Sequence, residues 1–415
     1  MNDFGKRELN QVGISNEFSS RHDFHIADWL RNAERHTMQQ MLSMDGSPDI
    51  ISFALGLPAP DSFPNQAYAE AVSHLLARDR VAFQLTPPFQ PLKRHIVEMM
   101  KERGIDCTEE QVFLISGAQQ GLDLVARMFL NQGTQVILEE ASYTGFHKAI
   151  EPFQPEILTV PVDPQTGIDL DAVETLLLDG ARPAFIYTMS DGHNPLGISM
   201  PRENRVRLVE LARQYHIPII EDDAYGFIYY QETPNPPLRA LEDKWVLYIG
   251  SFSKILGPSL RTGWMIVPSE LTSKLAVIKS LIDIDCATFT QRAISAFIDL
   301  GYLKSQLTYV RQDYCERCDI MIEALKKYFP PQARWHKPNS GVFIWVELPE
   351  QVDTMKLLKA AVEQEKVAFV PGSAFSINAQ ACLSNSLRLN FTNCRRDKIE
   401  DGIARLAKVV KTMIK

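Results

Sequence analysis

Short apolar segments alternate with helix-like segments between residues 112 and 250, and this alternation restricts the fold more than any other feature. Each apolar segment has the length of a buried strand, and the helix-like segments carry apolar residues at helical spacing. Such alternation is typical of an α/β fold with a mostly parallel sheet. The expected strands are 112–115, 136–138, 184–188, 217–220 and 245–249.

The two ends of the chain have different patterns. After Gln291 we expect a long helical stretch to about Phe329, and then short strands near 341–346, 368–370 and 386–391. This grouping indicates a second, α+β domain. Residues up to about 25 are polar, and residues 27–44 have near-helical apolar spacing. The expected division is an N-terminal arm and helix at 1–48, a large ligand-binding domain at 49–295 and a small domain at 296–415.

A lysine follows the last expected strand, in the sequence GSFSK (250–254), and Arg261 comes seven positions later. Ligands bind at strand ends in open α/β sheets. Lys254 there can attack a carbonyl if its amine is partly neutral. Ser251, Ser253 and Arg261 suit a phosphate. Together they describe a site for pyridoxal phosphate, although an isolated motif of this kind is more often a surface loop.

Other strand ends carry further candidate residues. The turn SGAQQG (116–121) opens a helix, whose free N–H groups and dipole favour phosphate. Tyr143 follows the next strand and can stack on a flat ring or belong to the core. Asn194 precedes a proline, which holds its backbone extended so that its side chain can serve as a fixed hydrogen-bond donor. The alternative is an ordinary Asn-Pro turn without a binding role. His193 beside it is expected to be a loop residue without a role.

Three acids end the strand at 217–220, in the sequence EDDAY (221–225). Acids at a buried strand end are costly unless cations or hydrogen-bond donors accompany them. A carboxylate here can pair with a pyridinium nitrogen, and Tyr225 can donate a hydrogen bond. Earlier in the chain, the extended segment 50–60 contains Gly and Pro and can bring backbone close to a ligand, but a connecting loop is equally compatible.

Composition excludes several classes of protein. The 415 residues are 45% hydrophobic, which is enough for one large domain or a large and a small one. The net charge of −8, with acids and bases interspersed, argues against a nucleic-acid surface. No segment approaches the roughly 18 apolar residues of a membrane span. The first seven residues lack an apolar signal core.

The six cysteines do not form a disulfide framework in a chain of this length. Cys315 and Cys318 form a CxxC motif in a helical-looking stretch, and no second pair at zinc spacing supports it. We therefore expect no metal site and a reducing, cytoplasmic location.

In combination these motifs resemble the fold type I pyridoxal-phosphate enzymes, in the class I/II aminotransferase family, and within it the α-aminoadipate/kynurenine and aromatic aminotransferases. The resemblance covers about residues 45 to 410. It is carried by ISFALGLPAPDSFP (51–64), SGAQQGLDLVARMFL (116–130), HNPLG (193–197), EDDAYG (221–226), SFSKILGPSLRTGW (251–264), VPGSAF (370–375) and SLRLNF (386–391).

The resemblance implies a mostly parallel seven-stranded sheet and a role for each candidate residue. Lys254 would form an imine with pyridoxal 5′-phosphate and later carry a proton. Asp222 would keep the ring nitrogen protonated. Asn194 and Tyr225 would hydrogen-bond the phenolic oxygen of the cofactor, and Tyr143 would stack on its ring. The phosphate would be bound by Ala118, Gln119, Ser251, Ser253 and Arg261. The substrate would be bound by Arg388, Asn194 and Gly56, with Arg388 binding its α-carboxylate through two hydrogen bonds.

The sequence departs from the family pattern at three places. Leu85 stands where the family has a tyrosine that the neighbouring subunit supplies to the phosphate. The turn that follows, at 87–91, reads PPFQP and lacks the usual glycine. Leu196 replaces the threonine of Asn-Pro-Thr-Gly. The first two changes leave the cofactor residues intact, but they favour a bulky or apolar substrate, or an extended biosynthetic one, over aspartate or glutamate as the primary donor.

Three functions compete at this point. The favoured one is an aminotransferase that moves an amino group from an amino acid to a 2-oxo acid. The alternatives are a pyridoxal-phosphate β- or γ-lyase or carbon–carbon bond-forming enzyme, and the effector domain of a transcription regulator. The 50 residues that precede segment 51–64 are few for a winged-helix domain. We also expect a homodimer, with the N-terminal helix and residues 281–290 as candidate contacts.

Overall fold

The structure is a computed structural model that describes residues 27–31, 49–85, 89–231, 234–377 and 383–414. The chain divides into two compact units, Met1–Glu34 and Arg35–Lys415. The described element of the first unit is the short helix α1 (Asp28–Arg31). The sequence predicts a helix over 27–44, and residues 32–44 lie outside the described residues. All other elements belong to the second unit.

A seven-stranded sheet forms the centre of the second unit, as predicted. Strand order is β2-β10-β9-β8-β7-β3-β4, and only β10 runs antiparallel to its neighbours. The strands expected from the sequence did not include β4 and β10. The strands are β2 (Val112–Ile115), β3 (Gln135–Glu139), β4 (Glu156–Val160), β7 (Ile186–Thr188), β8 (Ile219–Asp222), β9 (Val246–Ser251) and β10 (Gly263–Ile266).

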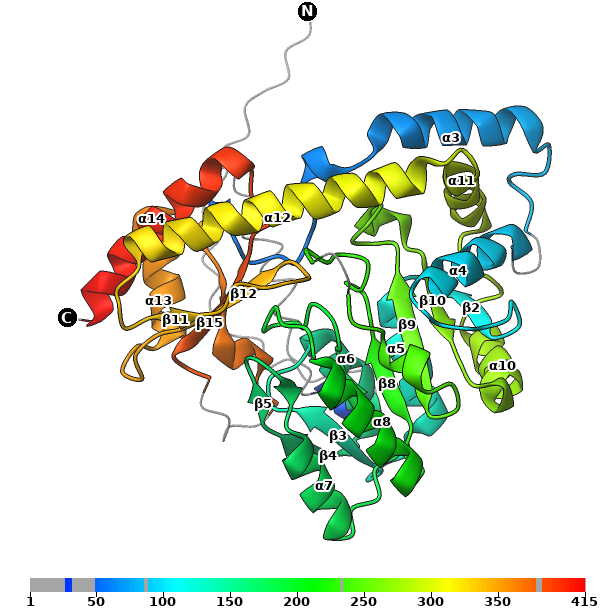
Figure 1. Ribbon diagram of the computed structural model, residues 1–415, viewed down its shortest axis with the longest axis horizontal. Coiled ribbons are helices and arrows are strands. Elements are labelled where there is room, and N and C mark those ends of the chain that lie inside the picture. Colours follow the sequence, from blue (N-terminus) through cyan, green and yellow to red (C-terminus); the bar gives the residue numbers. More distant parts are fainter. Residues whose placement is uncertain (1–26, 32–48, 86–88, 232–233, 378–382, 415) are drawn as a thin grey trace, which may run out of the picture. The chain divides into compact units, whose positions relative to one another are not determined.

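Helices cover both faces of this sheet, which is why its strands are apolar throughout (Figure 1). Neighbouring strand residues point to opposite faces. Ile186 and Ile219 pack with α7 and α8, whereas Tyr187 and Ile220 belong to the cluster that contains α5. The helices of this region are α5 (Ala118–Phe129), α6 (Thr144–Ile150), α7 (Leu170–Leu178), α8 (Arg202–Tyr215), α9 (Leu238–Leu241) and α10 (Thr272–Ile282).

A smaller four-stranded sheet lies in the C-terminal part, in agreement with the expected α+β pattern. Its order is β11-β12-β15-β14, and all its pairs are antiparallel. The elements are β11 (Arg334–Trp335), β12 (Phe343–Glu347), β14 (Val370–Pro371), β15 (Ser386–Asn390), α12 (Tyr302–Tyr328), α13 (Thr354–Ala360) and α14 (Arg396–Ile414).

The helical stretch predicted after Gln291 is two helices rather than one. Helix α11 (Thr288–Asp299) ends before Gly301, whose φ of 80° begins a new helix, α12. Few residues other than glycine adopt this left-handed backbone, so Gly301 marks the break. Cys315 and Cys318 both lie on α12. Within the described parts of the chain, no group of three potential metal ligands occurs, and no helix has the length and apolarity that a membrane span requires.

The extended segment before the large sheet connects the two parts of the fold. Strand β1 (Ile51–Ser52) pairs in parallel with β13 (Val367–Ala368). The helices α3 (Asn65–Arg78) and α4 (Gln90–Glu102) follow. The remaining short elements are the hairpin β5 (Val162–Asp163) and β6 (Gly167–Ile168), the π-helix Ala361–Glu365, and the 3-10 helices Pro60–Ser62, Glu151–Phe153, Pro258–Leu260, Ser269–Leu271 and Gly372–Phe375.

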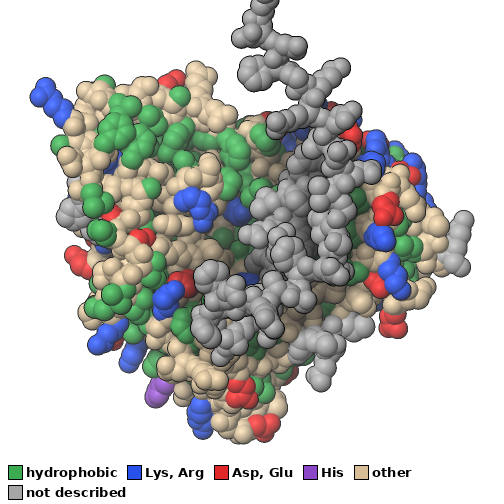
Figure 2. All heavy atoms as spheres, turned by 180° about the vertical axis from the view of Figure 1, so that it is seen from behind, with side chains coloured by type: hydrophobic (Ala, Val, Ile, Leu, Met, Phe, Trp, Pro, Cys, Tyr) green, Lys and Arg blue, Asp and Glu red, His purple; other side chains and the backbone are tan. Residues whose placement is uncertain are grey.

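Exposed hydrophobic side chains gather in two segments. The loop after α3 exposes Phe83 by 80% and Leu85 by 63%, and α10 and the residues after it expose Leu281 by 81% and Ile284 by 86%. Figure 2 shows hydrophobic side chains collected at its upper left, the side to which a half turn brings α3. Exposure of several large apolar side chains together is typical of an interaction surface.

Candidate active site

A cavity of about 260 Å³ lies at the carboxyl ends of the parallel strands. Its position follows the rule for open α/β sheets. The structure brings every candidate residue from the sequence to its wall: Gly56, Ala118, Gln119, Tyr143, Asn194, Asp222, Tyr225, Ser251, Ser253, Lys254, Arg261 and Arg388. Sequence reasoning missed five other lining residues: Leu55, Leu57, Met189, Ala224 and Pro258.

Lys254 follows β9 and extends into the cavity. Its Nζ donates a 2.7 Å hydrogen bond to the backbone carbonyl of Gly56 and lies 5.7 Å from the centre of the Tyr225 ring. Burial, followed by repulsion from Arg388 and Arg261, lowers the pKa of Lys254 to about 8, although Asp222 opposes the shift. A substantial fraction of the amine is therefore neutral near pH 8, as a nucleophile requires.

Asp222 and Asp223 point in different directions, as the alternation of a strand requires. Asp222 lines the cavity, and its Oδ2 accepts a 3.0 Å hydrogen bond from the Tyr187 hydroxyl. Its Oδ1 is buried and has no hydrogen-bond partner among the described residues. Burial raises the pKa of Asp222 to about 6, against the hydrogen bonds from the Tyr187 hydroxyl and the Ala224 backbone N–H and against the charge of Lys254. An unpartnered buried carboxylate oxygen in a cavity is suited to a cationic ligand group.

Asp223 is instead part of a buried ionic network. Arg103 donates to its Oδ2 at 2.7 Å, and the Tyr248 hydroxyl donates to the same atom at 2.8 Å. Burial raises the pKa of Asp223, and the charge of Arg103 opposes this shift. Asp223 does not line the described cavity, so of the two neighbouring acids Asp222 is the one available to a ligand.

One end of the cavity is suited to a phosphate. Helix α5 begins at Ala118, and in the described structure no side chain caps its N-terminus. Arg261 donates a 2.8 Å hydrogen bond to the Ser116 carbonyl, just before this helix. Gly117 has a φ of 85°, a backbone conformation that favours glycine, and a Cβ there would lie 2.7 Å from the Arg261 guanidinium. Free helix N–H groups, two serine hydroxyls and a guanidinium together form an anion site.

Arg388 lies on β15, is buried and lines the same cavity. Its guanidinium stands 4.2 Å and 4.9 Å from the ring centres of Phe343 and Phe375. It donates to the Asn194 side chain at 2.6 Å and to the Ala54 carbonyl. Among the described residues no acid pairs with Arg388, and burial lowers its pKa to about 10. A rigid guanidinium without a carboxylate partner is suited to bind one from a substrate.

The loop that carries Asn194 is attached to the end of β3 by a side-chain contact. His193 is buried, and its Nε2 lies 2.8 Å from the Glu139 carboxylate at the end of β3. His193 is therefore a buried, paired residue of the loop beside Asn194, and the expectation that it has no functional role stays a prediction. Leu196 also packs in a buried cluster with Trp345 and Phe375. The replacement of threonine by leucine thus places an apolar side chain in the cluster next to Arg388.

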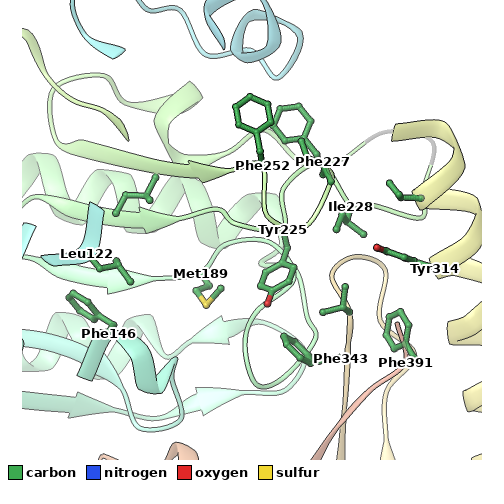
Figure 3. Packing of buried hydrophobic residues seen from close by; sticks show 14 of the residues in the cluster. Leu122, Phe146, Met189, Tyr225, Phe227, Ile228, Phe252, Tyr314, Phe343 and Phe391 are labelled. Atoms are coloured by element: carbon green, nitrogen blue, oxygen red, sulfur yellow. The ribbon is translucent and has the colours of Figure 1, made fainter. Parts of the chain in front are cut away.

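Figure 3 shows how the aromatic wall is built, with Tyr225 and Phe343 pointing toward one another and Met189 close by. The Tyr225 and Phe343 rings meet edge to face, with centroids 5.6 Å apart. Burial raises the pKa of Tyr225 far above its usual value, so its hydroxyl stays protonated and can donate a hydrogen bond. Leu85 and Phe89 do not line this cavity as the described residues define it.

Comparison with known proteins identifies the family. Residues 48–406 match the aminotransferases of class I and II. The chain belongs to this family. An aromatic-amino-acid aminotransferase of Thermococcus litoralis is 35% identical over 91% of this chain and 92% of its own length. The present chain is also similar to a solved kynurenine aminotransferase of Pyrococcus horikoshii. The TM-score is 0.88 and the identity 33%, over 94% of this chain and 98% of that one.

A third relative was solved with a covalent cofactor derivative. It is the α-aminoadipate aminotransferase of Thermus thermophilus in complex with N-(5′-phosphopyridoxyl)-L-leucine. The TM-score is 0.86 and the identity 33%, over 94% of this chain and 98% of that one. The protein described here is accordingly a pyridoxal-phosphate-dependent aminotransferase, and the family match favours transamination over the lyase and bond-forming alternatives.

The residues of the cavity fit pyridoxal phosphate. Lys254 offers a partly neutral amine, Asp222 has an unpartnered carboxylate oxygen, and the N-terminus of α5 lies at the cationic end with Arg261. When bound, the cofactor supplies an electron sink for the carbanion that forms when the substrate loses its α-proton.

Proposed function

We propose that Lys254 is the attachment point of the cofactor and the group that moves the proton. Its Nζ, once released by the incoming amino acid, takes the proton from the substrate α-carbon and returns one to the cofactor side. The pKa of about 8 supports this role, because a general base works best when its pKa is near the working pH. The Gly56 carbonyl, 2.7 Å from Nζ, orients the amine.

The cofactor ring is held by four side chains in this proposal. Asp222 pairs with the ring nitrogen, and its unpartnered oxygen supports this role. Asn194 and Tyr225 hydrogen-bond the phenolic oxygen, and Tyr143 covers one ring face. Burial raises the pKa of Tyr143 to about 12, so this residue also remains neutral.

The phosphate is held by backbone and side-chain donors together. Ala118 and Gln119 contribute the N–H groups at the start of α5, and Ser251, Ser253 and Arg261 contribute side chains, which all line the same cavity. The positive end of the helix dipole and the Arg261 charge both favour a dianion.

The preferred amino donor has an uncharged, apolar or aromatic side chain. The cations that line the described cavity are Lys254, Arg261 and Arg388, and all three have a role in holding the cofactor or the α-carboxylate. None therefore remains to pair with an acidic side chain. Leu55, Leu57 and Pro258 supply apolar surface instead. This charge balance is the observation that carries the proposal. The names of the aromatic-amino-acid and kynurenine relatives agree with it, whereas the name of the α-aminoadipate relative gives a donor with an acidic side chain.

The first half-reaction tests this specificity without interference from the acceptor. The holoenzyme is mixed with one amino acid at a time, and conversion of the cofactor from its aldehyde to its amine form is followed by absorbance. We expect phenylalanine and leucine to react with a kcat/KM at least about tenfold above that of aspartate, because an unpaired buried charge is costly. A clear preference for aspartate or glutamate would contradict the proposal.

We also propose that the enzyme is a homodimer. The exposed apolar side chains after α3 and along α10 support an association surface that a second copy covers, and α10 leads into the predicted contact at 281–290. Light scattering across micromolar dilution tests this assembly. A stable active monomer would contradict it, and Leu281→Asp with Ile284→Asp should weaken the dimer.

The division into a large domain at 49–295 and a small domain at 296–415 is retained as part of this proposal, with α11 spanning the boundary. A cytoplasmic location is also proposed. The described cysteines, Cys107, Cys286, Cys315, Cys318 and Cys394, are all free, which is the usual state in a reducing compartment.

A further inference from the structure

Two buried tyrosines make the same kind of hydrogen bond to two neighbouring acids. Tyr187, on β7, donates to Asp222 Oδ2 at 3.0 Å, and Tyr248, on β9, donates to Asp223 Oδ2 at 2.8 Å. Both tyrosines are fully buried. The two acids differ in their access to a ligand, because Asp222 lines the cavity and Asp223 does not.

Tyr187 is held in place by its own surroundings. Its ring stacks on Phe146 with centroids 4.1 Å apart and planes 24° apart, and its backbone is paired with Ile220 in the neighbouring strand β8. Strand pairing and ring stacking together leave the hydroxyl little freedom. Tyr187 does not line the cavity, so it acts on a ligand only through Asp222.

The Asp222 carboxylate therefore has one occupied and one open oxygen. Oδ2 receives the Tyr187 hydroxyl, whereas Oδ1 is buried without a described partner. Asp223 also has one oxygen without a partner, but its other oxygen is shared by Tyr248 and Arg103. A carboxylate that is anchored at one oxygen keeps its plane fixed, which directs the second oxygen.

We propose that Tyr187 is a positioning residue, whose hydroxyl anchors Asp222 so that the second carboxylate oxygen is directed to the ring nitrogen of the cofactor. This inference rests on the proposed role of Asp222. The bond also favours the ionised form of Asp222, because it is donated to the carboxylate. The other groups that face Asp222 are the backbone N–H of Ala224, Lys254 after β9, Tyr143 before α6 and Tyr225 after β8.

The test uses Tyr187→Phe with Tyr248→Phe as its matched control. Each variant removes one buried hydroxyl from one of the two acids and keeps the ring. Holoenzyme is prepared with cofactor labelled with nitrogen-15 in the ring, and the nitrogen resonance reports ring protonation between pH 6 and 9. For Tyr187→Phe we expect a shift toward the unprotonated value, and a fall in kcat of about tenfold to a hundredfold with little change in KM.

Tyr248→Phe should leave both the resonance and kcat close to those of the wild type. The proposal is overturned if Tyr187→Phe leaves the resonance unchanged, or if both variants shift it equally. If Tyr187→Phe does not fold, Phe146→Leu takes its place, because this change loosens the Tyr187 ring and keeps the hydroxyl. A smaller shift in the same direction is then expected, and no shift would equally overturn the proposal.

Asp222→Ala separates this inference from the proposed role of Asp222. If Asp222 pairs with the ring nitrogen, Asp222→Ala shifts the resonance, and Tyr187→Phe added to it causes no further shift. If Asp222→Ala causes no shift, the role of Asp222 is wrong. If Asp222→Ala shifts the resonance but Tyr187→Phe alone does not, only the positioning role of Tyr187 is wrong.

Discussion

The Lys254 amine donates a 2.7 Å hydrogen bond to the backbone carbonyl of Gly56, which is 198 positions earlier in the chain. Gly56 follows β1, and β1 pairs with β13 in the C-terminal part. This bond thus joins the lysine after the large sheet to a segment that is anchored on β13. Movement of that segment would change the position of the amine directly.

Gly56→Ala tests how closely this segment must approach. A Cβ at Gly56 would lie 2.7 Å from the Phe343 ring, so the segment or the ring has to shift. We expect kcat to fall by about tenfold, since a displacement of about 1 Å near the reacting group is costly. Gly257→Ala is the control, because its added methyl would meet its neighbours at 3.9 Å and 4.0 Å. Equal activity in the two variants would show that the close packing at Gly56 is unimportant.

Lys254→Ala should abolish both turnover and the absorbance of the lysine-bound cofactor. The reason is that no other amine lines the described cavity. Reduction with borohydride followed by peptide mapping locates any remaining attachment. A reducible bond between protein and cofactor in this variant would show that Lys254 is not the attachment point.

The neighbouring acids should respond very differently to substitution. Asp222→Ala removes the carboxylate that lines the cavity, and we expect kcat to fall by a factor of about a hundred or more. Asp223→Ala leaves Arg103 buried without its 2.7 Å partner, so its main cost should be stability. Steady-state kinetics and thermal unfolding of both variants separate these effects. Similar kcat values for the two, or the reverse order, would contradict the assignment.

Much of this site could be predicted because its residues follow apolar strands along the chain. Lys254, Asp222 and Asn194 each come just after a segment that reads as a buried strand, and parallel strand ends meet at one edge of the sheet. Arg388 was found by its likeness to the family, since a lone arginine in a C-terminal strand carries no local signal of its own.

The features that sequence reasoning missed depend on contacts between distant residues. The His193 pair with Glu139 spans 54 positions, and neither residue signals the other. Strand β10 lies between β2 and β9, and strand order is not encoded locally. Tyr187 did carry a usable signal, because a tyrosine within a buried strand needs a hydrogen-bond partner for its hydroxyl.

The pH dependence of cofactor binding should reveal the lowered pKa of Lys254. A lowered pKa means that the neutral amine appears at lower pH, so attachment to the apoenzyme should accelerate with a midpoint near pH 8, rather than near 10.5. Stopped-flow absorbance at several pH values measures this midpoint. Arg388→Met removes the largest repelling charge and should move the midpoint upward. A midpoint near 10.5 in the unaltered enzyme would contradict the assignment.

Leu85→Tyr tests the departure from the family at the loop after α3. Leu85 is 63% exposed, and its side chain has no hydrogen-bond donor. The tyrosine of the resembled family gives the phosphate one hydrogen bond from the neighbouring subunit. The remaining phosphate donors, among them Ser251 and Arg261, must hold the cofactor with less help. One hydrogen bond to a charged group is worth about 1.5–3 kcal/mol, so the variant should retain cofactor about ten to a hundred times more tightly.

Leu85→Tyr should also reduce the range of amino acids that the enzyme accepts, because the larger tyrosine side chain would replace leucine at the substrate site of the neighbouring subunit and narrow it. Dialysis followed by fluorescence of the remaining cofactor measures retention, and the half-reaction measures the range. Val81→Tyr is the control, since Val81 is 51% exposed on the same loop and adds the same ring at another place. If Leu85→Tyr and Val81→Tyr both leave retention unchanged, Leu85 does not face the cofactor of a neighbouring subunit.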